Sequence, residues 1–181
     1  MLDEENLVQR AQQKDEAAFT RLYEQYSVKI YRYVVVKVGN SMEAEDITQQ
    51  VFLNAFRSLP SFKWKGQPFS SWLFRIAHNQ IVDYLRKKTK RITEPLIEET
   101  TAGGKDPEEL VERKLSIEQL VSATKHLTRA QQEVISLRFA AELSVAEAAK
   151  VMGRSEGAVK ALQHSAIVAL RKELVGKSDG K

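Results

Sequence analysis

Aromatic and basic residues alternate in one short segment of the sequence, comprising Phe62, Lys63, Trp64 and Lys65. Aromatic rings offer stacking faces to unpaired bases, worth roughly 1–3 kcal/mol per base, while lysine and arginine hold the phosphate backbone. A basic cluster follows further along, at Arg86, Lys87, Lys88, Lys90 and Arg91. This combination predicts contact with single-stranded or melted nucleic acid rather than with intact duplex. For three neighbouring aromatics at helical spacing, a place in the hydrophobic core is the stronger interpretation: Phe69, Trp72 and Phe74.

A second segment, residues 144–170, predicts a helix, a short turn and another helix. Ser144 and Glu147 have the spacing of a capping box, and Gly153 permits the turn conformation. This is the layout of a helix-turn-helix, whose second helix enters the DNA major groove. The exposed face of that helix would carry Glu156, Lys160, Gln163, His164 and Arg171. A plain helical hairpin with a solvated polar face is the alternative.

Hydrophobic periodicity predicts helices along the rest of the chain, and no strand pattern competes with it. The expected helices cover residues 3–13, 16–38, 42–58, 69 or 70 to 90, 107–126, 128–139, 144–152 and 156–175. Asp15, Thr128 and Ser144 are expected N-caps, and Gly39 is expected to end its helix with a left-handed backbone. The core stripes of the second and third helices are expected to comprise Phe19, Leu22, Tyr23, Tyr26, Ile30, Tyr33, Ile47, Val51, Phe52 and Phe56.

Composition narrows the class of protein. The 181-residue chain has no cysteine, which excludes disulfides and thiolate metal sites. No apolar run approaches the ~20 residues needed to cross a bilayer, and the N-terminus lacks the apolar core of a signal peptide. We therefore expect a cytoplasmic protein without membrane insertion.

Charge is distributed in three blocks. Residues 1–91 carry 15 Lys/Arg against 10 Asp/Glu, and residues 113–181 carry 12 against seven. Between them, residues 92–112 carry one Lys against seven acids and hold two of the four prolines. This middle segment is expected to be a flexible acidic linker, because it cannot bury enough apolar surface to offset its ordering entropy. The basic blocks suit a polyanionic partner, although a solvated basic surface explains the charge equally well.

The motifs together resemble one protein family. The run AEDITQQVFLNAFRSLPSFKWKGQPFSSWLFRIAHNQIVDYLRKKTKR is similar to region 2 of the extracytoplasmic-function group of sigma-70 factors. The run LTRAQQEVISLRFAAELSVAEAAKVMGRSEGAVKALQHSAIVALRKEL resembles region 4 of the same family. The resemblance implies an all-α protein of two small helical domains, with region 2 in residues 1–91, the linker in 92–112 and region 4 in 113–181. It also implies a function: directing RNA polymerase to promoters and melting the −10 element.

Roles in region 2 follow from this resemblance. One helix would dock on a coiled coil of the largest polymerase subunit through Asp46, Gln49, Gln50 and Phe52. Gln50 stands where the family usually has glutamate. The −10 element would be held, and an unstacked base captured, by Phe62, Lys63, Trp64, Lys65, Asn79, Arg86, Lys87, Lys88 and Arg91.

Roles in region 4 are implied in the same way. The −35 element would be contacted by Arg154, Ser155, Lys160, Ala161, Gln163, His164, Ser165 and Arg171. Ser165 departs from the arginine that is common near this position. Region 4 of such factors also meets the polymerase flap, and an anti-sigma protein often covers the polymerase-binding faces.

Two other classes of protein are alternatives to this family. A stand-alone helix-turn-helix regulator, with residues 1–91 as a ligand or dimerisation domain, explains the C-terminus but leaves the lysine–tryptophan segment without a purpose. An enzyme is rejected, because the sequence has no nucleophile-elbow, phosphate-loop or zinc-protease motif. His78, His126 and His164 are far apart in the sequence, so no metal, cofactor or catalytic residue is expected.

Overall fold

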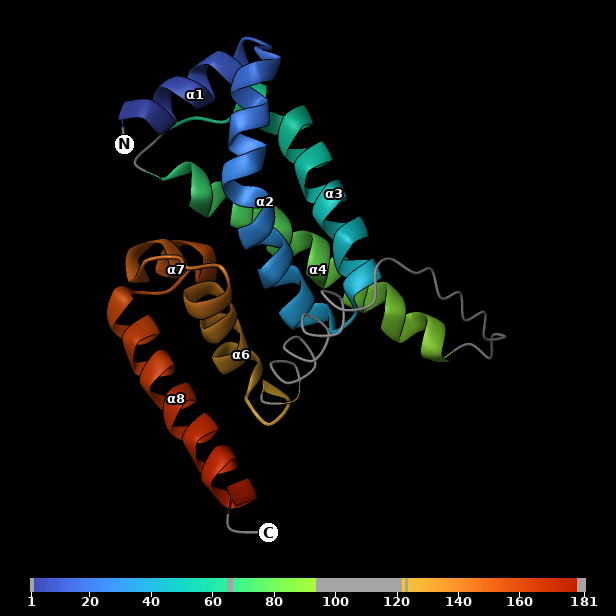
Figure 1. The fold of residues 1–181 in the computed structure, drawn as a ribbon, viewed down its shortest axis with the longest axis vertical. Helices are drawn as coiled ribbons and strands as arrows, with labels where there is room; N and C mark the ends of the chain where they lie inside the picture. Colours follow the sequence, from blue (N-terminus) through green and yellow to red (C-terminus); the bar gives the residue numbers. More distant parts are fainter. Residues whose placement is uncertain (1, 65–66, 94–121, 123, 179–181) are drawn as a thin grey trace.

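The computed structural model describes residues 2–64, 67–93, 122 and 124–178 of the chain, and within these ranges the secondary structure is entirely helical. The N-terminal group comprises α1 (Leu2–Gln12), α2 (Glu16–Val38), α3 (Ser41–Ser58), the 3₁₀ turn η1 (Leu59–Ser61) and α4 (Phe69–Thr93). The C-terminal group comprises α6 (Arg129–Ile135), the π-helical turn η2 (Ser136–Ala140), α7 (Val145–Met152) and α8 (Glu156–Ser178). The all-α prediction is confirmed (Figure 1). None of the described helices has the length and apolar character needed to span a membrane.

Local capping chemistry sets the boundaries of α2 and α3. The Asp15 side chain accepts a hydrogen bond from the Ala18 N–H, which satisfies one of the free donors of the first turn. Gly39 ends α2 with φ of 76°, and its N–H donates to the Val35 carbonyl. Asn40 then begins α3 by accepting from the Glu43 N–H at 3.0 Å. The predicted roles of Asp15 and Gly39 are confirmed.

Packing in the N-terminal group differs from the predicted stripes at two aromatic residues. Tyr23 is 43% exposed and Phe56 is 48% exposed, so their assignment to the core was wrong. Both rings instead cover the rim of the core: Phe56 packs edge-to-face on Phe19, and Tyr23 packs in the same way on Phe52. Helical spacing alone cannot separate a core position from such a rim position. The remaining stripe residues are buried or half-buried, as predicted.

Two capping boxes order the C-terminal group. Thr128 and Gln131 form one at the start of α6, and Ser144 and Glu147 form the predicted one at the start of α7. In each, the hydroxyl accepts from the third N–H while the longer side chain reaches back to the N-cap N–H. The predicted helix over residues 128–139 is present, but its second half is the π-helical turn η2.

The two groups contact each other through α2 and η2 and through α4 and α7. The linker predicted over residues 92–112 and the helix predicted over 107–126 lie almost wholly outside the described residues, although α4 continues to Thr93. The sequence predicted two small domains, and it did not predict that the two groups would pack against each other.

A paired glycine substitution tests the turn between α7 and α8. Gly153 has φ of +62°, Gly157 is helical, and a Cβ added at either meets no atom within 4 Å. Gly153→Ala should therefore lower the free energy of unfolding by about 1–2 kcal/mol, because an L side chain disfavours the left-handed backbone. Gly157→Ala, the matched control, should raise it by about 0.5–1 kcal/mol. Urea unfolding followed by circular dichroism measures both, and shifts of the same sign would contradict the assignment.

Candidate nucleic-acid and protein interfaces

Four aromatic rings gather where η1 leads into α4. The ring centroid of Phe62 lies 5.7 Å from that of Trp64, 4.9 Å from Trp72 and 5.9 Å from Phe69. The segment is held from outside by Gln12 of α1, whose amide donates to the carbonyls of Leu59 and Phe62 at 3.0 and 2.8 Å. This tether was not predicted, because a polar residue on a short helix has no sequence signal for a partner so far along the chain.

The structure corrects the expectation that Phe62 offers its ring to a base. The residue is only 7% exposed, and it forms the centre of the aromatic cluster. Trp64 is half-buried and packs on Phe62, so part of its indole remains accessible next to the exposed Lys63. Lys65 lies outside the described residues. Phe62 therefore supports Trp64, whereas Phe69, Trp72 and Phe74 belong to the core or pack against it, as predicted.

Along α4, the predicted contact residues lie at the surface but are not all free. Asn79 and Lys87 are exposed, and Arg86 is exposed with an ion pair to Asp83 at 3.0 Å. Lys88 donates to the Tyr84 hydroxyl at 2.9 Å and to Glu43 of α3 at 3.1 Å. These two partners raise the pKa of Lys88 and tie the helix to α3. Arg91 lies in α4, but its side chain is outside the described set.

One face of α3 is polar at its centre and apolar at one end. Asp46, Gln49 and Gln50 are exposed and, at three- and four-residue steps, share this face with Leu53 and Phe56, which are 46% and 48% exposed. Phe52 is only 6% exposed, so its prediction as a contact residue is corrected to a supporting one. Exposed large apolar residues beside polar ones are typical of protein-binding surfaces. Leu53 and Phe56 were missed, although their spacing from Gln49 was a usable signal.

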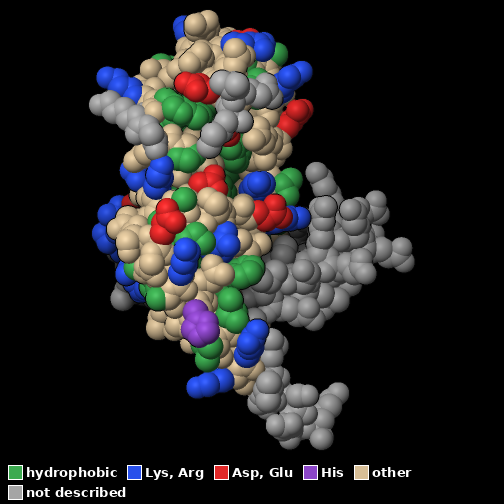
Figure 2. Space-filling view, turned by 90° about the vertical axis from the view of Figure 1, so that its left-hand side faces the viewer, with side chains coloured by type: hydrophobic (Ala, Val, Ile, Leu, Met, Phe, Trp, Pro, Cys, Tyr) green, Lys and Arg blue, Asp and Glu red, His purple; other side chains and the backbone are tan. Residues whose placement is uncertain are grey.

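The exposed face of α8 carries most of the predicted duplex-contacting residues: Lys160, Ala161, His164, Ser165 and Arg171. Gln163 is half-buried and accepts from Arg138 Nε at 2.9 Å, so its amide has a structural partner. Ser155 accepts from the Ala158 N–H at 3.2 Å and caps the helix. Arg154 is exposed in the preceding turn. Figure 2 shows basic side chains scattered among acidic ones on the side where α8 lies, rather than one continuous basic stripe.

Both parts of the chain match families of known proteins. The family described as Sigma-70 region 2 matches residues 22–91, and that described as Sigma-70, region 4 matches residues 123–172. The sequence is 41% identical to the ECF RNA polymerase sigma factor BldN of Streptomyces coelicolor, over 93% of this chain and 64% of that protein. It is 32% identical to SigW of Bacillus subtilis, over 92% of this chain and 94% of that protein. The fold is similar to that of CnrH in its complex with the cytosolic domain of CnrY, with TM-score 0.74, 24% identity and coverage of 96% and 98% of the two chains.

The corrected role of Phe62 has a measurable consequence. Phe62→Ala should lower the free energy of unfolding by about 3–5 kcal/mol, because it removes a buried ring from the centre of the aromatic cluster. Lys63→Ala, one position along on the exposed side, should change it by less than about 0.5 kcal/mol. Equal and small effects in chemical denaturation would show that Phe62 is not a core residue.

Proposed function

Because the chain belongs to the extracytoplasmic-function sigma factors of the sigma-70 family, we propose that it directs core RNA polymerase to promoters through three surfaces carried by separate helices. The observation that carries this function is similarity to such factors along nearly the whole chain, including both regions in order. We assign region 2 to residues 1–91, the linker to 92–112 and region 4 to 113–181. The protein acts in the cytoplasm and itself catalyses no reaction.

The polymerase-binding surface is the exposed face of α3. Asp46, Gln49 and Gln50 supply its polar part, and the exposed Leu53 and Phe56 extend it with apolar area. Its partner is the coiled coil of the largest subunit. The apolar residues matter because desolvated apolar anchors carry most of the energy of protein interfaces, while exposed polar contacts mainly set orientation. The buried Phe52 anchors α3 in the core and so supports this face.

The −10 surface centres on Trp64. Its indole rests on the buried Phe62 and is therefore held in place before DNA arrives, which lowers the entropy lost on stacking a base. Asn79 adds an exposed amide that can both donate to and accept from a base edge. Lys63, Arg86 and Lys87 hold phosphates. Trapping one base helps offset the few kcal/mol needed to unstack it.

The −35 surface is the first half of α8. Lys160, Ala161 and His164 face the major groove, with Arg154 at the preceding turn and Arg171 further along for the backbone. Because Gln131 of α6 donates to the Ser165 hydroxyl at 2.8 Å, that serine is partly committed to holding α6 against α8. Region 4 also meets the polymerase flap.

An anti-sigma protein is proposed as a further partner. CnrH is solved with the cytosolic domain of CnrY, and RpoE of Bartonella quintana is solved with the anti-sigma factor NepR. A partner of this kind would cover the α3 face with its exposed Leu53 and Phe56.

A promoter-opening assay tests this function against a stand-alone DNA-binding regulator. With core polymerase, the chain should give run-off transcripts from a subset of a promoter library and permanganate-reactive thymines near −10, whereas alone it should bind duplex weakly. Trp64→Ala should reduce permanganate reactivity by about 5- to 100-fold, in line with one lost stacking contact. Specific duplex binding without polymerase, and no association with core in a pull-down free of inhibitor, would contradict the proposal.

A second substitution separates base reading from phosphate contact in region 4. Lys160→Ala should weaken binding to the preferred −35 sequence by about 1–3 kcal/mol if the ammonium group reads a base edge. Electrophoretic competition with a scrambled −35 element measures this with polymerase present. An equal loss on the scrambled element would assign Lys160 to the phosphate backbone. Lys125→Ala, at an exposed lysine before α6, serves as the control.

A further inference from the structure

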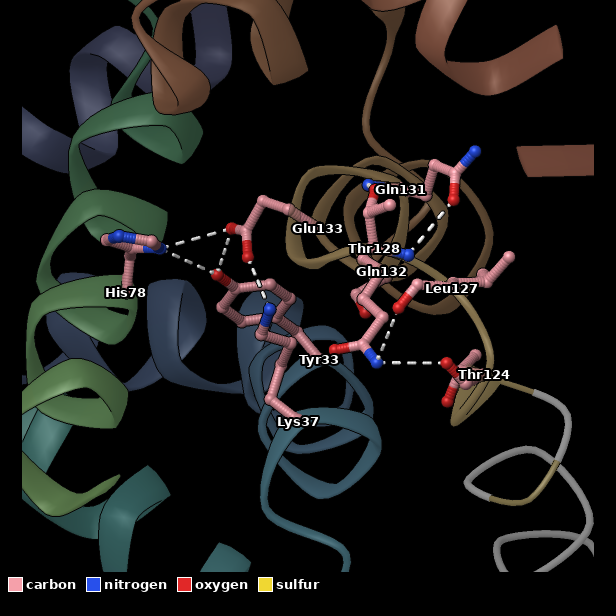
Figure 3. Close-up of polar contacts among 10 residues, drawn as sticks. Tyr33, Lys37, His78, Thr124, Leu127, Thr128, Gln131, Gln132 and Glu133 are labelled. Atoms are coloured by element: carbon pink, nitrogen blue, oxygen red, sulfur yellow. Dashed lines mark hydrogen bonds and ion pairs between the residues drawn. The ribbon is translucent and has the colours of Figure 1, made fainter. Parts of the chain in front are cut away.

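A buried carboxylate joins the two helical groups. Glu133 of α6 points between α2 and α4, where its Oε1 accepts from the Tyr33 hydroxyl at 2.5 Å and lies 3.1 Å from His78 Nδ1 (Figure 3). Its Oε2 lies 2.7 Å from Lys37 Nζ. The side chains of Glu133 and Lys37 are 10% and 13% exposed, so this ion pair is largely removed from water. All three partners of the carboxylate come from the other group.

The carboxylate is ionised at neutral pH despite its burial. Desolvation alone would raise its pKa, but the contacts with His78, Lys37 and Tyr33 outweigh it and lower the pKa of Glu133 to about 2. A lowered pKa means that the ionised form stabilises the packed arrangement fully above the ordinary value of 4.5, and that this stabilisation is lost as pH falls towards 2. The Glu133 carboxylate is therefore ionised throughout the physiological pH range.

Further contacts join the two groups at the same interface. The Ser70 hydroxyl donates to Glu147 of α7 at 2.5 Å, and Arg75 donates to the Lys150 carbonyl at 3.0 Å. At the exposed edge, Arg32 pairs with Glu142 at 3.2 Å. The first two contacts hold α4, which carries Asn79, against α7, the first helix of the helix-turn-helix.

This packing places the two proposed DNA-binding surfaces close together. Helix α7 contacts both α4 and α8, and packed helices lie about 8–10 Å apart, so the axes of α4 and α8 are separated by at most roughly 20 Å at these contacts. DNA elements centred near −10 and −35 are about 25 base pairs apart, which is roughly 80 Å at about 34–36 Å per turn. The packed arrangement cannot contact both elements of one duplex together.

We propose that Glu133, held by Tyr33, Lys37 and His78, is an intramolecular latch that keeps the free protein closed, and that the latch must open before both promoter elements are bound. This inference rests on the proposed function for its consequence but not for the latch itself. Only the open form can bind both elements. The apparent affinity of the free protein for promoter DNA is therefore the affinity of the open form multiplied by the fraction of molecules that are open.

Thiol labelling can detect opening even when it is rare, because the chain has no native cysteine. Ser70→Cys places a single thiol at the interface, at a position 2% exposed, and reacts with maleimide only when the groups separate. Ala55→Cys, buried within α3, reports unfolding of the N-terminal group instead. For each cysteine variant, the full-length protein with the cysteine alone is compared with proteins that also carry a second substitution: Glu133→Gln, Lys37→Met or Glu142→Gln.

Glu133→Gln should raise the labelling rate at Ser70→Cys on the order of a hundredfold, since breaking one side of a buried ion pair leaves the other charge unpaired. Lys37→Met should act in the same direction from the opposite side. Glu142→Gln removes a carboxylate that is 56% exposed from the same interface and should change the rate less than about fivefold. Labelling at Ala55→Cys should stay constant.

Two results would overturn the latch: equal rates for Glu133→Gln, Lys37→Met and Glu142→Gln, or a parallel rise at Ala55→Cys, which would indicate unfolding rather than opening. A core-polymerase pull-down with the unlabelled proteins is run alongside. If Ser70→Cys responds as expected but no form binds core, the proposed function fails while the latch stands. If core binds but the labelling rates do not differ, the latch fails alone.

Discussion

The structure is organised around α2, a helix that is covered on every side at its C-terminal end. Four consecutive residues, Tyr33 to Val36, are buried there, which is unusual because an amphipathic helix normally exposes one side. Helices α3 and α4 and the turn η2 all contact α2. A helix in this position must satisfy any polar group that it buries. The Tyr33 hydroxyl does so by donating a hydrogen bond to Glu133 of α6. This bond joins the interior of the N-terminal group to the C-terminal group.

Each of the three proposed binding surfaces lies on a separate, rigid part of the structure. Each proposed contact face lies on a helix or on the segment Phe62–Trp64, which packs on aromatic rings, so each has its shape before a partner arrives. The packing of the two groups against each other includes several polar contacts and the largely buried ion pair between Glu133 and Lys37. Such an interface is specific, because each polar group must meet its partner in the right geometry, and removing one charge of a buried ion pair is costly because the other is left unpaired.

Local features were predictable from the sequence, and long-range ones were not. Asp15, Gly39 and Ser144 act through neighbours within a few residues, so their capping roles could be assigned from spacing. The burial of Phe62 depends on Trp72 and Phe69 folding back over it, and a polar stretch containing two lysines argued for the opposite. Glu133 stands after two glutamines near the start of a helix and resembles an ordinary surface acid. No local pattern identifies the tyrosine, lysine and histidine that surround it.

The tether from Gln12 shows that family boundaries and folding boundaries differ in this chain. The region 2 match begins at residue 22, yet α1 lies before it and holds the backbone on either side of Pro60 through two carbonyls. Helix α1 also buries Leu7 and Val8. A fragment trimmed to the matched segment would keep every aromatic residue of the cluster. It would lose the two hydrogen bonds from Gln12 that fix the backbone leading into the cluster. Swaps of region 2 between related factors should therefore carry their own first helix with them.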